Sequence, residues 1–198
     1  MTQNIRIFTA LPLSDLIRKL IFSHIPAWQA TLSFERWVHS LDWHITLHFI
    51  GDVHPSALSD IELAMRKAVS ELSSFSLSLT DLGVFGRGER PSVLWLGLDG
   101  DMKSLHLLHD ALGTALMAST GFTPESRPFK PHMTLARKYA GLETCSTELL
   151  SQSSSLIQQH STAFTIDRIV LYRTHLGHSP MYEEIFSCPL PLNPPPHN

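Results

Sequence analysis

The chain has 198 residues, of which 43% are hydrophobic and 17% are charged, and its formal net charge is −3. This composition is typical of a globular protein with one large domain or two small lobes, and the negative charge excludes a protein that coats long nucleic acids. No apolar run approaches the roughly 20 residues that a membrane-spanning helix needs. A strand pattern begins almost at the N-terminus, so we expect no signal peptide, no contact with membranes and a cytoplasmic location.

Cys145 and Cys188 are the two cysteines of the chain. Two cysteines are too few for a disulfide framework, and they do not form a Cys-x-x-Cys motif. We therefore expect both to be free thiols in a reducing compartment.

Helical and strand periodicities divide the first half of the chain into short elements. Ser14 and Asp15 suit the first turn of a helix, which Pro26 is expected to end. Gly51 is expected to stop a later strand. The predicted elements are a strand over 5–10, a helix over 13–24, a loop over 27–42, a strand over 43–50, a helix over 55–72, and strands over 75–84 and 93–98.

The second half repeats this order of elements, which indicates a distant internal duplication. Strands that closely follow strands favour antiparallel pairing and an α+β fold. We treat residues 1–188 as one structural unit and expect residues 189–198, which hold five prolines, to form a disordered tail. The predicted elements are a helix over 101–119, a polar connection over 122–131, a strand that begins at 132 and ends before 141, a helix over 143–159, and strands over 163–172 and 181–188.

The same motif, His-x-Thr-Leu, occurs once in each half, at His44 and Thr46 and again at His132 and Thr134. Both copies lie in predicted strands, where side chains alternate between the two faces. Each histidine therefore shares a face with its threonine. The residues between and after them are expected to face the core: Ile45, Leu47, Phe49, Met133 and Leu135.

Two opposed histidines can act as general acid and general base near neutral pH, each worth about a hundred- to ten-thousandfold in rate. Two threonine hydroxyls can hold phosphoryl oxygens between them, an arrangement that suits phosphodiester cleavage without a metal. A single His-x-Thr is usually only the polar face of a strand, and the chain has 12 histidines. Two copies of the longer motif, about half a chain apart, are much less expected by chance.

These paired motifs resemble those of the 2H phosphoesterases, specifically the RNA 2′,3′-cyclic phosphodiesterases, also called 2′-5′ RNA ligases. Further segments are similar to parts of that family, so the resemblance covers nearly all of the chain. They are an opening strand at 5–11, a central strand at 91–97, the lead-in to the second motif at 127–132, and a closing hairpin at 171–177 followed by Tyr182.

The resemblance implies two pseudo-symmetric lobes, each an antiparallel sheet with helices on its outer face, and an active-site cleft between them. It also implies hydrolysis of RNA 2′,3′-cyclic phosphate ends to 2′-phosphomonoesters, without a metal or other cofactor. In this mechanism His44 is the proton donor, His132 is the proton acceptor, and Thr46 and Thr134 bind the phosphoryl oxygens. By microscopic reversibility the same site could join a 2′-phosphate-type end to a 5′-hydroxyl. We expect a monomer.

Arg137 and His48 are further candidates for substrate binding. The family also has arginine at the position of Arg137, but strict alternation places this side chain opposite His132. It can reach a phosphate only where the strand ends or bulges. His48 is expected at the cleft rim. It lies about 13 Å along the strand from His44, too far for the two to share one zinc ion.

Four more cations are candidate partners for RNA phosphates. Arg127 and Lys130 precede the second motif, and Arg87 and Arg90 lie in a glycine-flanked turn. The alternative for each is a solvated loop charge.

Two further histidine pairs were weighed as possible sites. His106 and His109 share a helix face, where we expect solvent rather than a metal. His175 and His178 lie in a predicted hairpin loop, with a turn role, a substrate contact or plain exposure left open.

Two other functions remain open from the sequence. One is a 2H phosphodiesterase for a small cyclic nucleotide, such as an ADP-ribose cyclic phosphate, or for 2′-5′ oligoadenylate. The other is a non-catalytic module that binds RNA ends, although such a module has no need for two intact His-x-Thr pairs.

Overall fold

The computed structural model of the protein describes residues 3–86, 90–142 and 144–192. Within these ranges it has four α-helices and nine strands. The helices are α1 (Asp15–Thr31), α2 (Leu58–Val69), α3 (Met102–Thr120) and α4 (Thr147–Gln158). The strands are β1 (Ile5–Pro12), β2 (Phe34–Trp37), β3 (His44–Val53), β4 (Phe75–Phe85), β5 (Val93–Gly100), β6 (Met133–Tyr139), β7 (Ala163–Ile166), β8 (Arg168–Thr174) and β9 (Tyr182–Pro189).

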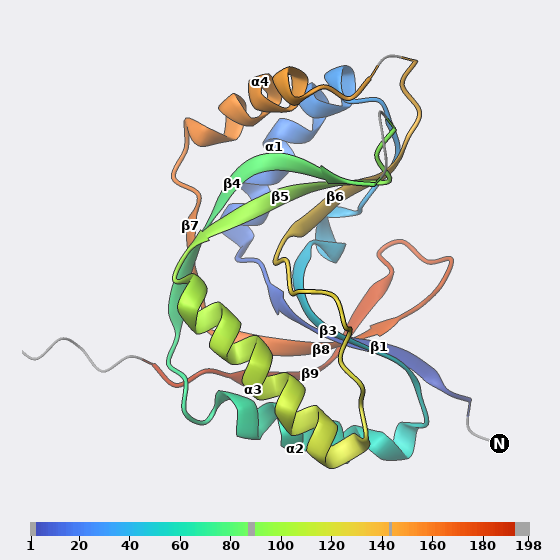
Figure 1. Ribbon diagram of the computed structural model, residues 1–198, viewed down its shortest axis with the longest axis vertical. Helices are drawn as coiled ribbons and strands as arrows, with labels where there is room; N and C mark the ends of the chain where they lie inside the picture. The colour runs from blue at the N-terminus through green and yellow to red at the C-terminus, as the bar shows by residue number, and fades with distance from the viewer. Residues whose placement is uncertain (1–2, 87–89, 143, 193–198) are drawn as a thin grey trace, which may run out of the picture.

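The strands form one curled antiparallel sheet in the order β7-β4-β5-β6-β3-β1-β8-β9, with β2 paired to β6. The sheet has two halves, which meet where Ile45 of β3 pairs with Met133 of β6. Helices α1 and α4 cover the half that contains β4, β5 and β6, whereas α2 and α3 cover the half that contains β1, β3, β8 and β9 (Figure 1). The predicted α+β fold with two lobes is therefore confirmed.

The chain passes back and forth between the two halves (Figure 1). Strand β1 lies in one half, α1 and β2 in the other, and β3 and α2 in the first again. Neither motif strand therefore belongs to a lobe made from one continuous segment. Both lie at the centre of the sheet, where the halves meet.

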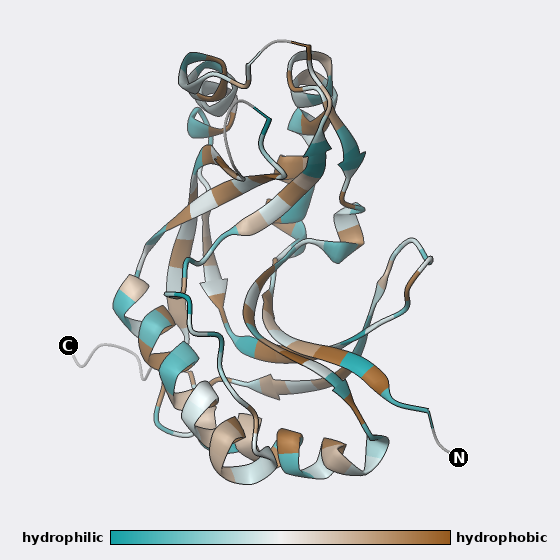
Figure 2. Cartoon of the chain, turned by 45° about the vertical axis from the view of Figure 1, so that its right-hand side comes forward, coloured by the Kyte–Doolittle hydropathy of each residue, from teal (hydrophilic) through white to brown (hydrophobic). Residues whose placement is uncertain are grey.

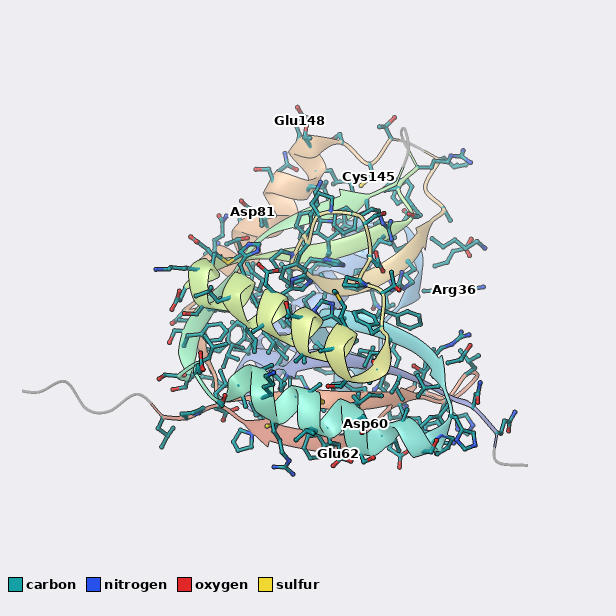
Figure 3. The ribbon with its side chains drawn as sticks, turned by 60° about the horizontal axis from the view of Figure 1, so that its bottom comes forward. Arg36, Asp60, Glu62, Asp81, Cys145 and Glu148 are labelled. Carbon is teal, nitrogen blue, oxygen red and sulfur yellow. The ribbon has the colours of Figure 1, made fainter. Side chains whose placement is uncertain are left out.

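Amphipathic elements build the core. In α2, Ile61 and Met65 are fully buried. The same helix also carries the charged residues Asp60 and Glu62, and it lies beside α3 (Figure 3). Apolar and polar residues alternate along the strands and helices of both halves (Figure 2). Among the described residues, no helix is long and apolar enough to cross a membrane. Cys145 and Cys188 are free thiols, as predicted.

Helix α1 was predicted to end at Pro26, but it continues to Thr31. A proline inside a helix loses one backbone hydrogen bond and disturbs the preceding turn. Here the next turn contains Trp28, which is fully buried and donates its indole N–H to the carbonyl of Ser153 in α4 at 2.9 Å. This packing holds the helix together past the proline, and the predicted loop over 27–42 is replaced in part by helix and by β2.

The C-terminal segment differs from the prediction in two places. The predicted strand over 163–172 is divided at Asp167 into β7, which pairs with β4, and β8, which pairs with β1. The predicted tail is packed at its start: Leu190 is buried, and its N–H donates to the carbonyl of Asp167 at 2.8 Å. Residues 193–198 lie outside the described residues.

Candidate active site

The pairing of β3 with β6 brings the two motifs together. His44, Thr46, His132 and Thr134 all line one hollow of about 420 Å³ between the two halves of the sheet. The structure therefore juxtaposes the four residues that the sequence placed on two separate strands.

The two histidines are held in the same way. His44 Nδ1 lies 2.7 Å from the carbonyl of Asp42, and His132 Nδ1 lies 2.7 Å from the carbonyl of Lys130. Because a carbonyl only accepts hydrogen bonds, each Nδ1 carries a proton, and the neutral ring keeps Nε2 as its acceptor. His44 Nε2 lies 3.1 Å from the hydroxyl of Thr46. In both halves, the nitrogen that can exchange a proton with substrate is Nε2.

Aromatic rings surround both imidazoles. The rings of Phe8, Tyr182 and Tyr172 lie 4.7, 5.2 and 5.8 Å from that of His44. Phe85 and Trp95 lie 4.8 and 6.2 Å from the ring of His132. Rings of this kind exclude water, which disfavours the charged imidazolium.

Burial lowers the pKa of His44 to about 4 and also lowers the pKa of His132. The positive charge of Arg137 lowers both pKa values further. Both rings are therefore mainly neutral near pH 7 in the free protein. A bound phosphate anion would favour the protonated form of either ring.

A β-bulge turns Arg137 into the cleft. Ala136 pairs with Leu94 and Thr134 pairs with Trp95, so Leu135 is an extra residue in β6. The bulge reverses the alternation beyond Leu135. Arg137 consequently lines the cleft beside Thr134, and strict alternation placed it on the wrong face.

The same irregularity occurs in β3. His48 pairs with Thr9 and Thr46 pairs with Ala10, so Leu47 is the extra residue. Phe49 was predicted to face the core, but this is wrong: it is 48% exposed and lines the cleft. The leucine shared by both motifs is the extra residue at the first irregularity of β3 and at the bulge of β6, and a second irregularity in β3 falls on Ile50.

A larger hollow of about 810 Å³ adjoins the smaller one and shares with it Thr46, Phe49, His132, Thr134 and Arg137. Its wall also includes three predicted substrate-binding residues, His48, Arg127 and Lys130. Arg127 is exposed and paired with Glu125 at 2.8 Å. Lys130 is exposed, and its carbonyl orients His132.

His48 lies deeper than the predicted rim position, with only 5% of its surface exposed. Its Nε2 is 2.8 Å from the carbonyl of His109, and the two imidazoles stack at 4.2 Å. On its other side His109 stacks on Phe129 at 3.9 Å. The expected solvated helix face is therefore wrong for His109, which packs between β3 and the connection to the second motif.

Of the remaining predicted residues, those that the structure describes line neither hollow. Arg90 is exposed in the turn between β4 and β5, and Arg87 lies outside the described residues. His175 bonds Glu183 at 2.7 Å within the β8–β9 hairpin, close to His178. Across the described part of the chain, no three His, Cys, Asp or Glu side chains group as a metal site requires.

Asp42 was not singled out in the sequence. Its side chain is buried, with 7% exposed, and its carboxylate accepts the backbone N–H groups of Met181 and Tyr182. An acidic residue before a strand is ordinarily solvated, so the sequence carries no signal for this contact.

Comparisons of the sequence with a family profile and with known proteins agree on one family. The profile described as the 2′-5′ RNA ligase superfamily matches residues 21–178. An RNA 2′,3′-cyclic phosphodiesterase of Geobacillus stearothermophilus is 36% identical over 92% of this chain, which spans 56% of that relative's length. One from Bacillus subtilis is 35% identical over 92% of this chain and 95% of its own length. The crystal structure of E. coli LigT complexed with 3′-AMP has the same fold, with a TM-score of 0.74 at 23% identity over 95% of this chain and 99% of that one.

Proposed function

This chain belongs to the 2′-5′ RNA ligase superfamily, and from that premise we propose that it hydrolyses RNA ends bearing a 2′,3′-cyclic phosphate to 2′-phosphomonoesters. The observation that carries the proposal is the pair of histidines, each oriented through Nδ1 by a backbone carbonyl, in one cleft with the two motif threonines. The names of the relatives from Geobacillus and Bacillus support this choice of substrate.

The reaction is an in-line displacement at phosphorus. His132, neutral, takes a proton from water through Nε2 as the water oxygen attacks. The bond from phosphorus to the 3′-oxygen breaks, and His44, protonated, donates its proton to that oxygen. The product carries a 2′-phosphate, and exchange with solvent restores the two protonation states. The division of roles follows the family resemblance.

The transition state gathers negative charge on the oxygens of phosphorus that do not bridge to the ribose. Thr46 and Thr134 can donate hydroxyl hydrogen bonds to these oxygens, and Arg137 offers a guanidinium on the same side of the cleft. Donors that are already in place before the reaction stabilise such charge without reorganisation. These groups supply acid, base and charge stabilisation, so we propose a mechanism without a metal or other cofactor.

We assign contacts with RNA beyond the phosphate to the larger hollow, through the exposed side chains of Arg127 and Lys130, with the buried His48 in its wall. The net charge of −3 is consistent with a protein that holds an RNA end by a few local cations. A 5′-hydroxyl in place of water would yield a 2′-5′ phosphodiester, which is the basis for proposing reversible ligation. We further propose a cytoplasmic monomer.

A substrate panel tests this function. In the presence of EDTA, the protein is given a short RNA ending in a 2′,3′-cyclic phosphate, the cyclic mononucleotide and an ADP-ribose cyclic phosphate, and the product ends are identified. We expect the RNA to be converted with the highest kcat/KM and to yield a 2′-phosphate. Preference for either small substrate would replace RNA in the proposal, and turnover abolished by EDTA would contradict the metal-free mechanism.

A further inference from the structure

The segment that leads to His132 has little structure of its own. Residues 121–132 connect α3 to β6 without a helix or strand, and they cross from one half of the sheet to the other (Figure 1). Three of these residues are prolines, which have no backbone N–H to donate. In the described part of the chain, no backbone–backbone hydrogen bond ties residues 122–130 to another element. Side chains must therefore fix the path of this connection.

Two phenylalanines, one near each end of the connection, pack on a pair of stacked imidazoles. The rings of His48 and His109 lie 4.2 Å apart. Phe122 meets His48 edge-on at 5.4 Å. Phe129 lies flat on His109, with the ring centres 3.9 Å apart and the planes at 11°. The same pair of histidines therefore holds both ends of the connection.

The pair of imidazoles is itself fixed in the structure. Because a carbonyl only accepts hydrogen bonds, His48 donates from Nε2 to the carbonyl of His109, at 2.8 Å. The backbone N–H of His48 donates to the hydroxyl of Thr9 at 3.1 Å. A Cβ at Gly113, one turn along α3, would come within 3.0 Å of the His48 ring, so glycine permits this close approach. These contacts join β1, β3 and α3 into one support for the connection.

The support reaches His132 through the residue that follows Phe129. The carbonyl of Lys130 accepts the Nδ1–H of His132 at 2.7 Å. The direction of this carbonyl depends on the backbone on both sides, which is held by Phe129 before it and by the start of β6 after it. A misplacement of about 1 Å in a reacting group can cost about a hundredfold in rate.

His44 does not depend on this support. Its Nδ1 is held by the carbonyl of Asp42, which ends a 3₁₀ turn (Ser40–Asp42). The carboxylate of Asp42 accepts the backbone N–H of Met181 at 2.9 Å. The two histidines of the site are therefore oriented from different anchors, and each can serve as a reference for the other.

We propose that His109 is a positioning residue for His132. Its ring holds Phe129, and through Phe129 it fixes the carbonyl that orients the proton acceptor of the proposed phosphodiesterase reaction, on which this inference rests. The flat face of the ring does this, not its charge. Nδ1 of His109 lies 2.9 Å from the carboxylate of Asp110, whose side chain is 76% exposed, and contacts at such a surface contribute little.

His109→Ala removes the ring and keeps the backbone carbonyl that His48 bonds. We expect kcat on the cyclic phosphate to fall about tenfold to a hundredfold, with a smaller change in KM, because His132 is misplaced. His109→Phe keeps a flat ring without the contact to Asp110 and should retain most of the wild-type kcat. Leu107→Ala, on the exposed surface of the same helix, is the control and should match wild type. A loss that His109→Phe does not restore contradicts the proposal.

Phe129→Ala removes the other ring of the stack. It also serves if His109→Ala does not fold, as thermal denaturation will show. We expect a loss in kcat similar to that of His109→Ala. Because both changes break one contact, the double variant should be no slower than the slower single variant. Losses that multiply in the double variant would show that the two rings act independently, and would overturn the proposal.

NMR of the imidazole protons, with no substrate present, separates this inference from the proposed function. The Nδ1–H groups of His44 and His132 are each held by a carbonyl. In His109→Ala we expect the Nδ1–H of His132 to exchange faster with water, while that of His44 is unchanged. If this difference is seen but wild type does not turn over the RNA, the reaction is wrong and the positioning of His132 stands. If His132 exchanges as in wild type, or both histidines change alike, the role of His109 is refuted.

Discussion

Strands β3 and β6 use the same backbone devices to present different chemistry. His44 at the start of β3 and His132 directly before β6 are each tied by Nδ1 to the carbonyl two residues earlier, and in both strands a bulged leucine follows the threonine. Two residues after that leucine a side chain enters the cleft. It is Phe49 in β3 and Arg137 in β6.

The contrast teaches that the repeated motif sets geometry, whereas the neighbours set roles. Asp42 and three aromatic rings surround His44. His132 instead has Lys130 as its orienting residue and the rings of Phe85 and Trp95 beside it, and the charge of Arg137 acts on both histidines. We propose that this symmetric pair of strands carries one acid and one base, a division of roles that follows the family resemblance.

The largest expected effect separates these two roles by the leaving group. His44→Ala should lose at least about a hundredfold in kcat/KM on the cyclic phosphate, because the 3′-oxygen then leaves without a proton. On a p-nitrophenyl phosphodiester, whose leaving group needs no proton, the same variant should lose much less. His132→Ala should be impaired on both substrates. Equal losses of His44→Ala on the two substrates would show that it is not the acid.

A somewhat smaller loss of activity is expected when the positive charge of Arg137 in β6 is removed. Arg137→Ala should lower kcat about tenfold to a hundredfold, because a donor to the developing phosphoryl charge is lost. Steady-state kinetics on the cyclic phosphate measure this. Arg36→Ala is the matched control, since Arg36 pairs with Arg137 across β2 and β6 but lies outside both hollows. A change in KM alone would place Arg137 in ground-state binding.

Phe49→Ala tests the corresponding position in β3, and we expect it to change mainly KM. An exposed ring in a cleft for RNA can stack on a base, which is worth about 1–3 kcal/mol. We expect KM for RNA to rise at least about fivefold with kcat nearly unchanged. Phe22→Ala, on the exposed surface of α1, is the control. An unchanged KM would assign Phe49 to packing only.

The smallest expected effect is on the pH dependence of the free energy of unfolding. Because the folded state lowers the pKa of His44 to about 4, the unfolded chain binds more protons between that value and about 6.5. The free energy of unfolding should therefore decrease as pH falls through this window. His44→Gln, which cannot titrate, should show a shallower decrease in urea denaturation. An identical slope in both proteins would mean that the pKa of His44 is not lowered in the folded state.

The sequence predicted the elements that carry the site because alternation around His44 and His132 is strong and local. It did not predict where side chains point beyond each bulge, since an extra residue in a strand depends on the register with its neighbours. Phe49 was therefore placed wrongly. The prediction that helix α1 ends at Pro26 was wrong for a related reason, because the burial of Trp28 against α4 is a contact between residues far apart in the sequence. The contact of Asp42 with Met181 is equally distant in sequence.

The most direct test of two histidines acting as a pair is turnover of a short RNA ending in a 2′,3′-cyclic phosphate, with EDTA present. Wild type, His44→Ala and His132→Ala are compared side by side, and the product end is identified. We predict a 2′-phosphate product, full wild-type activity in EDTA, and a loss of at least about a hundredfold in each variant. A variant of either histidine that retains wild-type turnover would contradict the account.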